Sequence, residues 1–201
     1  MNRRRFAATL AAIGFIRAGK LFAEPEDGSA VRENAEAETI QLSRNGWVPN
    51  NEDLPVLLYR EAIVPGHRRS TDTFEAAFQR NGWPPEWRSG IYDFHHYHST
   101  AHEVLGFAAG WGKLMLGGEA GQVVTVHAGD VAVLPTGTGH REIEASPDFL
   151  VVGAYPPNQE WDLCRSAPSP EAIARMRRLH FPAWDPVTGK NGSLPRLWRY
   201  S

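Results

Sequence analysis

Apolar and polar positions form short runs through the middle of the chain, and glycine, proline or aspartate interrupts each run. Seven runs have the length of a strand: 90–98, 103–109, 111–116, 122–127, 130–134, 141–145 and 149–154. An eighth apolar run, Leu54–Val64, precedes them. Short strands at such close spacing are typical of an antiparallel sandwich or barrel. The pattern therefore predicts an all-β fold.

Two segments outside the strand-rich region have the signature of a helix. Asp72, with Glu75 three residues later, forms a capping-box pattern, and the apolar positions that follow fall on one face. Ser169 as N-cap and Pro170 at the first helical position predict a second helix. The aromatic, turn-rich tail after it is expected to pack along the outside of the barrel or across a subunit contact. The β-fold thus carries a short helix on each flank.

The N-terminal residues divide the chain into three parts. Residues 1–23 combine three arginines with an uncharged run, Phe6–Ile16, whose eleven residues fall short of the roughly 20 that cross a bilayer. The RRRF sequence resembles a twin-arginine export signal, so we expect a periplasmic or secreted protein without a stable membrane span. The alternative is a basic helix on a cytoplasmic protein. Residues 24–39 are acidic and predict a linker, and residues 40–201 form one domain.

Charge and cysteine content exclude several classes of function. The 201 residues carry a net charge of −2 and an isoelectric point near 6.4, without the basic stripe of a nucleic-acid-binding protein. The single cysteine, Cys164, excludes an internal disulfide framework and any multi-cysteine metal site. A small-molecule partner remains as the expectation.

Histidine is concentrated in one short stretch. Four of the eight histidines fall within residues 95–103. Residues two apart on a strand point the same way, so His96 and His98 project together, while Glu103 opens the next strand beside them. His140 follows a Pro-Gly corner that supplies a third imidazole from elsewhere in the chain. Neutral imidazoles with one carboxylate are metal ligands.

These residues resemble the two motifs of the cupins. The first, G(x)5HxH(x)4E(x)6G, is matched by Gly90, His96, His98, Glu103 and Gly110. The second, G(x)5PxG(x)2H(x)3N, is matched by Gly129, Pro135, Gly137 and His140, whereas its last position holds Glu144 instead of Asn. The likeness covers a core of residues 90–153. Across most of residues 40–201 the amino-acid sequence is similar to that of a group of uncharacterised bacterial single-domain cupins.

The resemblance implies a single jelly-roll barrel with one divalent ion inside. Its ligands would be His96, His98, Glu103 and His140, and iron, manganese, nickel, copper or zinc would suit that ligand set. Four protein ligands on an octahedral ion leave two positions for water, oxygen or substrate. Pairing of single-barrel cupins is common, so a homodimer is expected.

Three functions fit this description. The first is a metal-dependent oxidoreductase that uses O₂ on a small organic substrate, as a dioxygenase does. The second is an isomerase or lyase whose ion acts as a Lewis acid, and it predicts activity without oxygen. The third is a small-molecule-binding protein without turnover, because a fold does not fix a function.

The remaining polar residues have weaker assignments. Glu144 shares strand parity with His140, so it is a candidate acid or base; the alternative is an exposed edge carboxylate. His102 adjoins Glu103 but points the other way, and we expect it at the surface or behind a ligand. His95 and Tyr97 are expected outside the pocket, and Tyr155 is a candidate to cap it.

Overall fold

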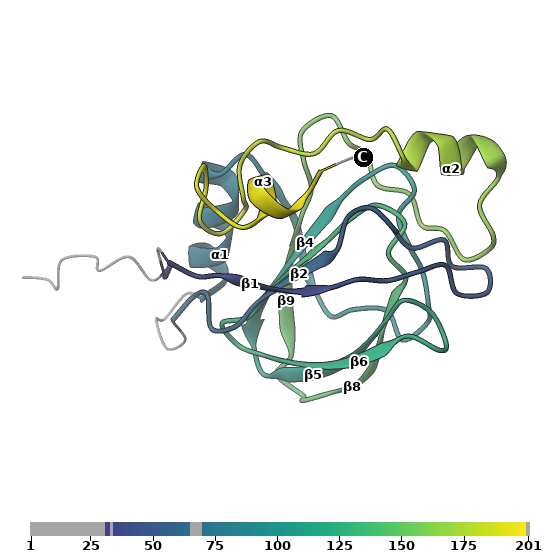
Figure 1. The fold of residues 1–201 in the computed structure, drawn as a ribbon. Coiled ribbons are helices and arrows are strands. Elements are labelled where there is room, and N and C mark those ends of the chain that lie inside the picture. Colours follow the sequence, from purple (N-terminus) through teal and green to yellow (C-terminus); the bar gives the residue numbers. More distant parts are fainter. Residues whose placement is uncertain (1–30, 33, 65–69, 200–201) are drawn as a thin grey trace, which may run out of the picture.

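Two antiparallel sheets make up the core of the computed structural model, which describes residues 31–199 apart from residue 33 and residues 65–69. The larger sheet has six strands in the order β1 (Ala37–Ile40), β2 (Val56–Tyr59), β7 (Val131–Leu134), β4 (Glu103–Ala109), β9 (Leu150–Ala154) and β3 (Pro85–Ser89). The smaller sheet has three, in the order β6 (Gln122–His127), β5 (Trp111–Leu116) and β8 (His140–Ala145). Figure 1 shows the small sheet lying below the large one. The all-β jelly-roll prediction is confirmed.

The central strands of the larger sheet are buried on both faces. Leu105 and Phe107 of β4 face the small sheet and pack with Leu114 and Leu116 of β5. The alternate residue Val104 faces the opposite side and joins a second core. A strand buried on both faces reads as a continuous apolar run, which explains why β2, β4 and β7 show no polar alternation.

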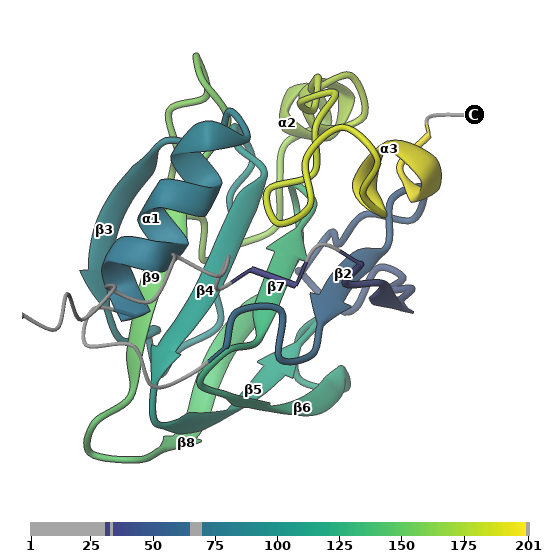
Figure 2. The same cartoon turned by 90° about the vertical axis from the view of Figure 1, so that its left-hand side faces the viewer.

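The outer face of the large sheet is covered by helix α1 (Ser70–Arg80) and by the C-terminal segment. Figure 2 shows α1 lying across β3, β9 and β4, and its buried residues Phe74, Ala77 and Phe78 are the predicted apolar face. The helix begins at Ser70, so the predicted N-cap at Asp72 is wrong. Asp72 lies in the first turn, where its carboxylate pairs with Arg88 of β3 at 3.0 Å.

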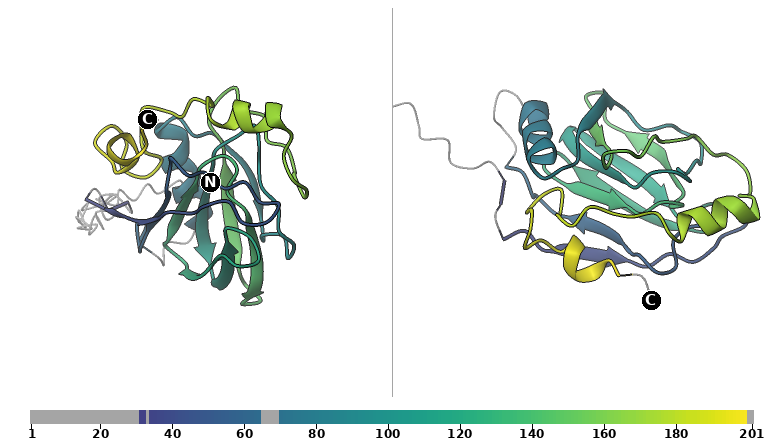
Figure 3. Two further views of the ribbon diagram at one scale, coloured as in Figure 1. Left: turned by 45° about the vertical axis from the view of Figure 1, so that its right-hand side comes forward. Right: turned by 90° about the horizontal axis from the view of Figure 1, so that it is seen from above.

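The C-terminal segment runs from α2 (Pro170–Met176) to α3 (Leu194–Leu197) along the β1–β2 side, as Figure 3 shows. Ser169 caps α2 as predicted, because its side chain accepts a hydrogen bond from the Ala172 amide. Trp198 is 1% exposed, and its indole donates to the Pro55 carbonyl at 2.8 Å. The prediction that the tail packs along the barrel is confirmed.

Six of the seven predicted strands in the motif region occur within one residue of their predicted bounds, but Gly90–His98 does not form a strand. It contributes only two isolated bridges, His96 with His140 and Tyr97 with Cys164. Two backbone carbonyls of this segment interact with groups outside any strand: Phe94 O faces the His96 ring, and His98 O accepts a hydrogen bond from the Gly137 amide. These carbonyls are therefore not available for regular pairing with a neighbouring strand.

The N-terminal predictions are tested only in part. Strand β1 begins at Ala37, inside the range predicted as a linker. Its backbone pairs with β2, and this pairing does not depend on an apolar side-chain pattern. The predicted export signal, residues 1–23, lies outside the described residues. Among the residues that the structure does describe, no helix has the length and hydropathy of a membrane span.

Candidate metal centre

Three histidines that the sequence singled out lie together between the sheets. His96, His98 and His140 are buried, and their ligand nitrogens all lie within 4.8 Å of one another. The Glu103 Oε2 atom lies 3.5 Å from His98 Nε2 and 3.4 Å from His140 Nε2. The structure therefore brings together all four residues that the motifs named. They are called the inner cluster below.

Each histidine of the inner cluster turns the same nitrogen away from the centre. His96 Nδ1 lies 3.2 Å from the Phe94 carbonyl and His140 Nδ1 lies 3.1 Å from the Thr138 carbonyl. His98 Nδ1 makes a short contact with the Asp162 carbonyl. A carbonyl only accepts, so each Nδ1 carries the hydrogen, and each Nε2 keeps its lone pair. Backbone carbonyls orient metal-binding histidines in this way.

A glycine turn aims His140 into the barrel. Gly137 has φ of +87°, a conformation that residues with a Cβ rarely adopt, and its amide donates to His98 O at 2.8 Å. The Asn50 side chain accepts from the Gly139 amide at 3.1 Å. His140 and His96 then exchange two backbone hydrogen bonds. The turn therefore fixes two histidines of the inner cluster relative to each other.

Glu103 is held by one oxygen and leaves the other unpaired. It is the first residue of β4 and shares the parity of Leu105, so its side chain points between the sheets. Tyr155 donates a 2.6 Å hydrogen bond to Oε1. Oε2 is buried without a hydrogen-bond partner among the described residues, and it faces the histidines. Buried polar atoms are almost always paired, so the unpaired Oε2 is suited to a cation bound between Glu103 and the histidines.

Burial and neighbouring charges act in opposite directions on the ionisable groups of the inner cluster. Burial lowers the pKa of His96 to about 3, and the neighbouring His140 adds to the effect. Burial alone would lower the pKa of His98, but the Glu103 carboxylate outweighs it and raises that pKa. Burial likewise opposes the charge on Glu103, yet His98 keeps the pKa of that carboxyl low. The buried Glu103 carboxylate therefore favours positive charge at the centre of the inner cluster.

The donor set fits the expected group of metals. Three imidazole nitrogens and one carboxylate oxygen suit iron, manganese, nickel, copper and zinc, and the set holds no thiolate. Glu103 supplies the negative charge that a divalent ion needs in a buried site. Tyr155 holds the second carboxylate oxygen, so Glu103 is arranged to bind through Oε2 alone.

His102 lies in the core, and the expectation of a surface position is wrong. It is 0% exposed and has the parity of Val104, so it faces away from the inner cluster. Its Nδ1 accepts from the Thr136 amide at 3.0 Å, and its Nε2 faces the Leu179 carbonyl at 3.3 Å. The C-terminal segment buries this ring, which local sequence does not reveal. His95 and Tyr97 are also buried, and neither belongs to the described lining of the cavity beside the cluster.

Glu144 is exposed and ion-paired, so the structure does not place it with the inner cluster. Its carboxylate lies 2.7 Å from Lys113 Nζ, and its side chain is 54% exposed. The pairing of β8 with β5 shifts register, because Glu142 lies opposite Leu114 while Glu144 lies opposite the adjacent Lys113. The extra residue, Ile143, reverses the parity that began at His140. Glu144 therefore points outward.

A cavity of about 360 Å³ opens beside the inner cluster. It is lined by Trp87, Ser89, Gly90, Ile91, Tyr92, His96, His98, Glu103, Leu105, His140, Tyr155 and Trp161. Tyr155, the candidate cap, is one of these lining residues and is buried. Sequence reasoning missed Trp161 and the carbonyl of Asp162, since the chain carries no motif there. It also missed Trp87, which packs so closely on Gly153 that a Cβ there would lie 1.9 Å from its ring.

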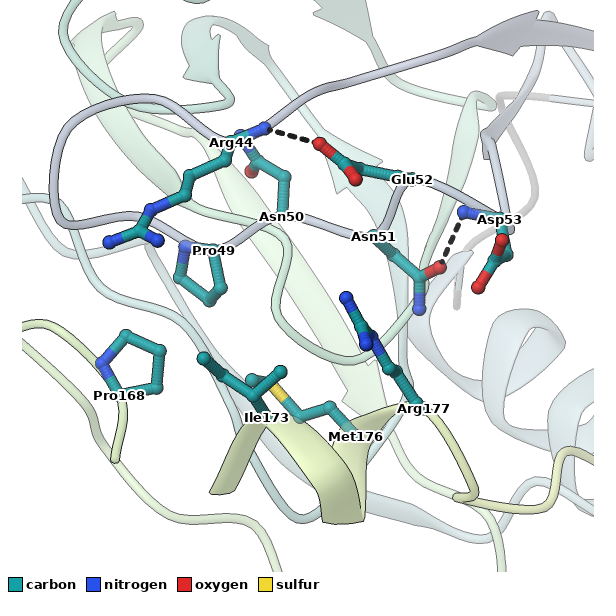
Figure 4. A pocket seen from close by; sticks show the side chains of 10 residues that line it. All are labelled: Arg44, Pro49, Asn50, Asn51, Glu52, Asp53, Pro168, Ile173, Met176 and Arg177. Atoms are coloured by element: carbon teal, nitrogen blue, oxygen red, sulfur yellow. Dashed lines mark hydrogen bonds between the residues drawn. The ribbon is translucent and has the colours of Figure 1, made fainter. Parts of the chain in front are cut away.

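A larger cavity of about 600 Å³ lies between α2 and the 44–53 loop (Figure 4). Its walls include two arginines, two carboxylates and Met176, and no residue of the inner cluster is among its described lining. Asn50 and Asn51 form part of its floor and reach the turn before His140, since Asn51 donates to Thr136 O at 3.3 Å. The 44–53 loop therefore supports the turn from behind, and the smaller cavity is the one that adjoins the inner cluster.

The chain is similar over most of its length to one curated protein. The Bacillus subtilis (strain 168) "Uncharacterized protein YjlB" is 34% identical over 165 residues, which are 81% of this chain and 97% of that protein. No family model matches the chain.

Three solved structures are similar at lower identity. A DUF861 family protein from Thermotoga maritima is 16% identical, with a TM-score of 0.32 over 49% of this chain and 96% of its own. A Klebsiella pneumoniae protein with a double-stranded β-helix domain is 18% identical, with a TM-score of 0.32 over 68% and 92%. The oxalate decarboxylase–formate complex of Lactobacillus farciminis is 18% identical, with a TM-score of 0.29 over 54% and 26%.

Proposed function

The chain belongs to the family of the Bacillus subtilis protein YjlB, and we propose that it is a metal-dependent cupin that uses O₂ to oxidise a small organic substrate. The observation that carries the proposal is the direction of the ligand atoms. Three Nδ1 atoms face backbone carbonyls, so three Nε2 lone pairs and the unpaired Glu103 Oε2 share one buried space. A structural histidine cluster would instead pair its inward atoms with one another or with the backbone.

The residues of the inner cluster have separate tasks in this proposal. His96, His98 and His140 would hold the ion as neutral imidazoles, and Glu103 would add the one negative charge. That charge would favour the oxidised state of the ion. An iron or copper ion would supply the redox chemistry with O₂ that amino-acid side chains lack. Four protein ligands would leave open positions toward the cavity, where a substrate has room.

Metal analysis and oxygen consumption test the proposal. The protein is purified from its own host compartment, its metal content is measured, and the iron-, copper- and zinc-loaded forms are assayed with a substrate panel. We expect about one ion per chain and oxygen uptake that depends on iron or copper and on a substrate. Turnover that persists in the zinc form without oxygen would contradict the redox proposal and favour an isomerase or lyase. Tight ligand binding without turnover in any form would favour a binding protein.

Export and dimer formation stay as proposals beside this function. We propose that residues 1–23 direct the protein to the periplasm and that two copies pair. Fractionation of host cells with and without Arg4→Lys and Arg5→Lys would test export, and light scattering of the purified protein would test pairing. Retention in the cytoplasm of the unchanged chain would contradict the first, and a monomer mass would contradict the second.

A further inference from the structure

The cavity beside the inner cluster has walls of aromatic rings. Trp87, Tyr92, Tyr155 and Trp161 all line it, with Ile91 and Leu105 as aliphatic neighbours. The Tyr155 and Trp161 rings are stacked, with centroids 5.9 Å apart and an interplanar angle of 19°. Walls of this kind offer flat apolar surface to a ligand, and they favour a flat ligand over a globular one.

Two of these rings remain exposed although they flank metal-binding histidines. Tyr92 is 49% exposed and lies edge-on to His96, with centroids 5.2 Å apart. Trp161 is 40% exposed and lies edge-on to His98, with centroids 5.6 Å apart. They come from segments before the first ligand and after the last strand, and both meet at one cavity. Exposed aromatic surface gathered at a cavity marks a binding site.

The charges around the cavity disfavour an anion. Among the described lining residues, none is Lys or Arg, and Glu103 is the one that carries a carboxylate. A further carboxylate, Glu86, accepts from the Trp161 indole at 3.0 Å. Arg165 is not among the described lining residues, and its guanidinium lies over the ring of Phe94, 3.9 Å from the centroid. A carboxylate or dicarboxylate ligand would find only the bound ion to neutralise it.

We propose that this cavity takes an uncharged, planar aromatic molecule, and that Trp161 selects for the ring. The proposal deepens the proposed function, because the same cavity would present an oxygen atom of this molecule to the ion. Trp161 determines specificity through its face, which the ligand covers, and Tyr155 supports it from behind. The preference for a planar ring depends neither on the identity of the ion nor on the use of O₂.

Three matched probes distinguish the effect of ligand planarity on affinity from the effect of ligand charge. 2-Naphthol is planar and neutral, 2-naphthoate is planar and anionic, and decahydro-2-naphthol is neutral but not planar; a two-ring molecule is small enough for about 360 Å³. Titration calorimetry is run on the zinc-loaded protein and on the metal-free protein. We expect 2-naphthol to bind about tenfold more tightly than the saturated alcohol in both forms. We also expect it to bind more tightly than 2-naphthoate in the metal-free form.

Substitutions of Trp161 test whether its ring is the source of the affinity for 2-naphthol. Trp161→Ala should weaken 2-naphthol binding about tenfold while zinc stoichiometry stays unchanged, and Trp161→Phe should restore most of the affinity because it restores a ring. Trp184→Ala is the control, since Trp184 is 46% exposed but lies outside the described lining. Equal binding of the planar and saturated alcohols, or preference for naphthoate without metal, would overturn the proposal. Because the metal-free titration needs no ion, this outcome is separate from failure of the oxidoreductase proposal.

Discussion

His102 and Glu103 are neighbours in the chain, both are fully buried, and they face opposite sides of the large sheet. On the outer side, both ring nitrogens of His102 meet backbone groups, one from Thr136 and one from Leu179. On the inner side, Glu103 Oε2 meets no hydrogen-bond partner within the described part of the chain. One strand end thus carries a satisfied polar group and an unsatisfied one.

The difference separates a structural role from a binding role where residue type does not. His102 and His98 are both buried histidines, yet burial lowers the pKa of His102 to about 4 with little opposition, whereas Glu103 raises the pKa of His98. His102 is therefore a neutral ring that joins the His140 turn to the C-terminal segment. In the inner cluster, by contrast, Glu103 Oε2 has no hydrogen-bond partner among the described residues, which is what a binding role requires. Four substitutions test this contrast, beginning with the largest expected effect.

His96→Ala should abolish stoichiometric metal binding, with affinity lowered more than about 100-fold, because one of three converging nitrogens is lost. Metal content after dialysis, measured by mass spectrometry, checks the result. The control His127→Ala removes an exposed histidine and should keep one ion per chain. Full metal content in His96→Ala would mean that the inner cluster is not the metal site.

His102→Ala should leave metal content nearly intact but lower the free energy of unfolding by about 2–4 kcal/mol. It removes a buried ring and leaves the Thr136 amide and the Leu179 carbonyl without their partner. Urea unfolding of the metal-free protein measures the loss, with His96→Ala as the comparison; the loss there should be smaller, because His96 has one backbone partner and His102 has two. Equal loss of metal in both variants would remove the distinction between the two faces.

Tyr155→Phe should weaken metal affinity about tenfold without changing the number of ions per chain. The hydroxyl that fixes Glu103 Oε1 is lost while the ring stays in place. Competition with a fluorescent chelator measures the affinity. Tyr97→Phe is the matched control, because that buried hydroxyl donates to Ser166 O, 2.9 Å away, and not to a ligand residue. A similar change in both variants would assign the effect to general loosening of the fold.

Glu144→Gln should change almost nothing. Its exposed ion pair with Lys113 contributes at most about 0.5 kcal/mol to the free energy of unfolding. Its side chain also points away from the cavity. Glu103→Gln, which removes the buried carboxylate, should lose the metal. Thermal unfolding and metal content of the two variants measure the contrast. A large loss of turnover in Glu144→Gln alone would restore it as an acid or base.

The sequence by itself determined six of the seven strands predicted in the motif region and the four residues of the inner cluster, because both depend on spacing along a backbone with a fixed repeat. Alternation placed Glu103 between the sheets and His102 outside them, and the two motifs named the histidines that converge. Parity failed at Glu144, since one extra residue at Ile143 shifts the register against β5. A bulge of this kind depends on the neighbouring strand and leaves no signal in the local pattern.

Only the tertiary structure decided which polar atoms find partners. Leu179 buries His102, Asp162 orients His98, Tyr155 takes one oxygen of Glu103, and Trp161 completes the cavity wall. Each of these contacts joins residues more than 50 positions apart or adds a wall from beyond the last strand. Hydrogen bonding and burial act through space, so the separation of structural from binding residues emerges only when the chain has folded.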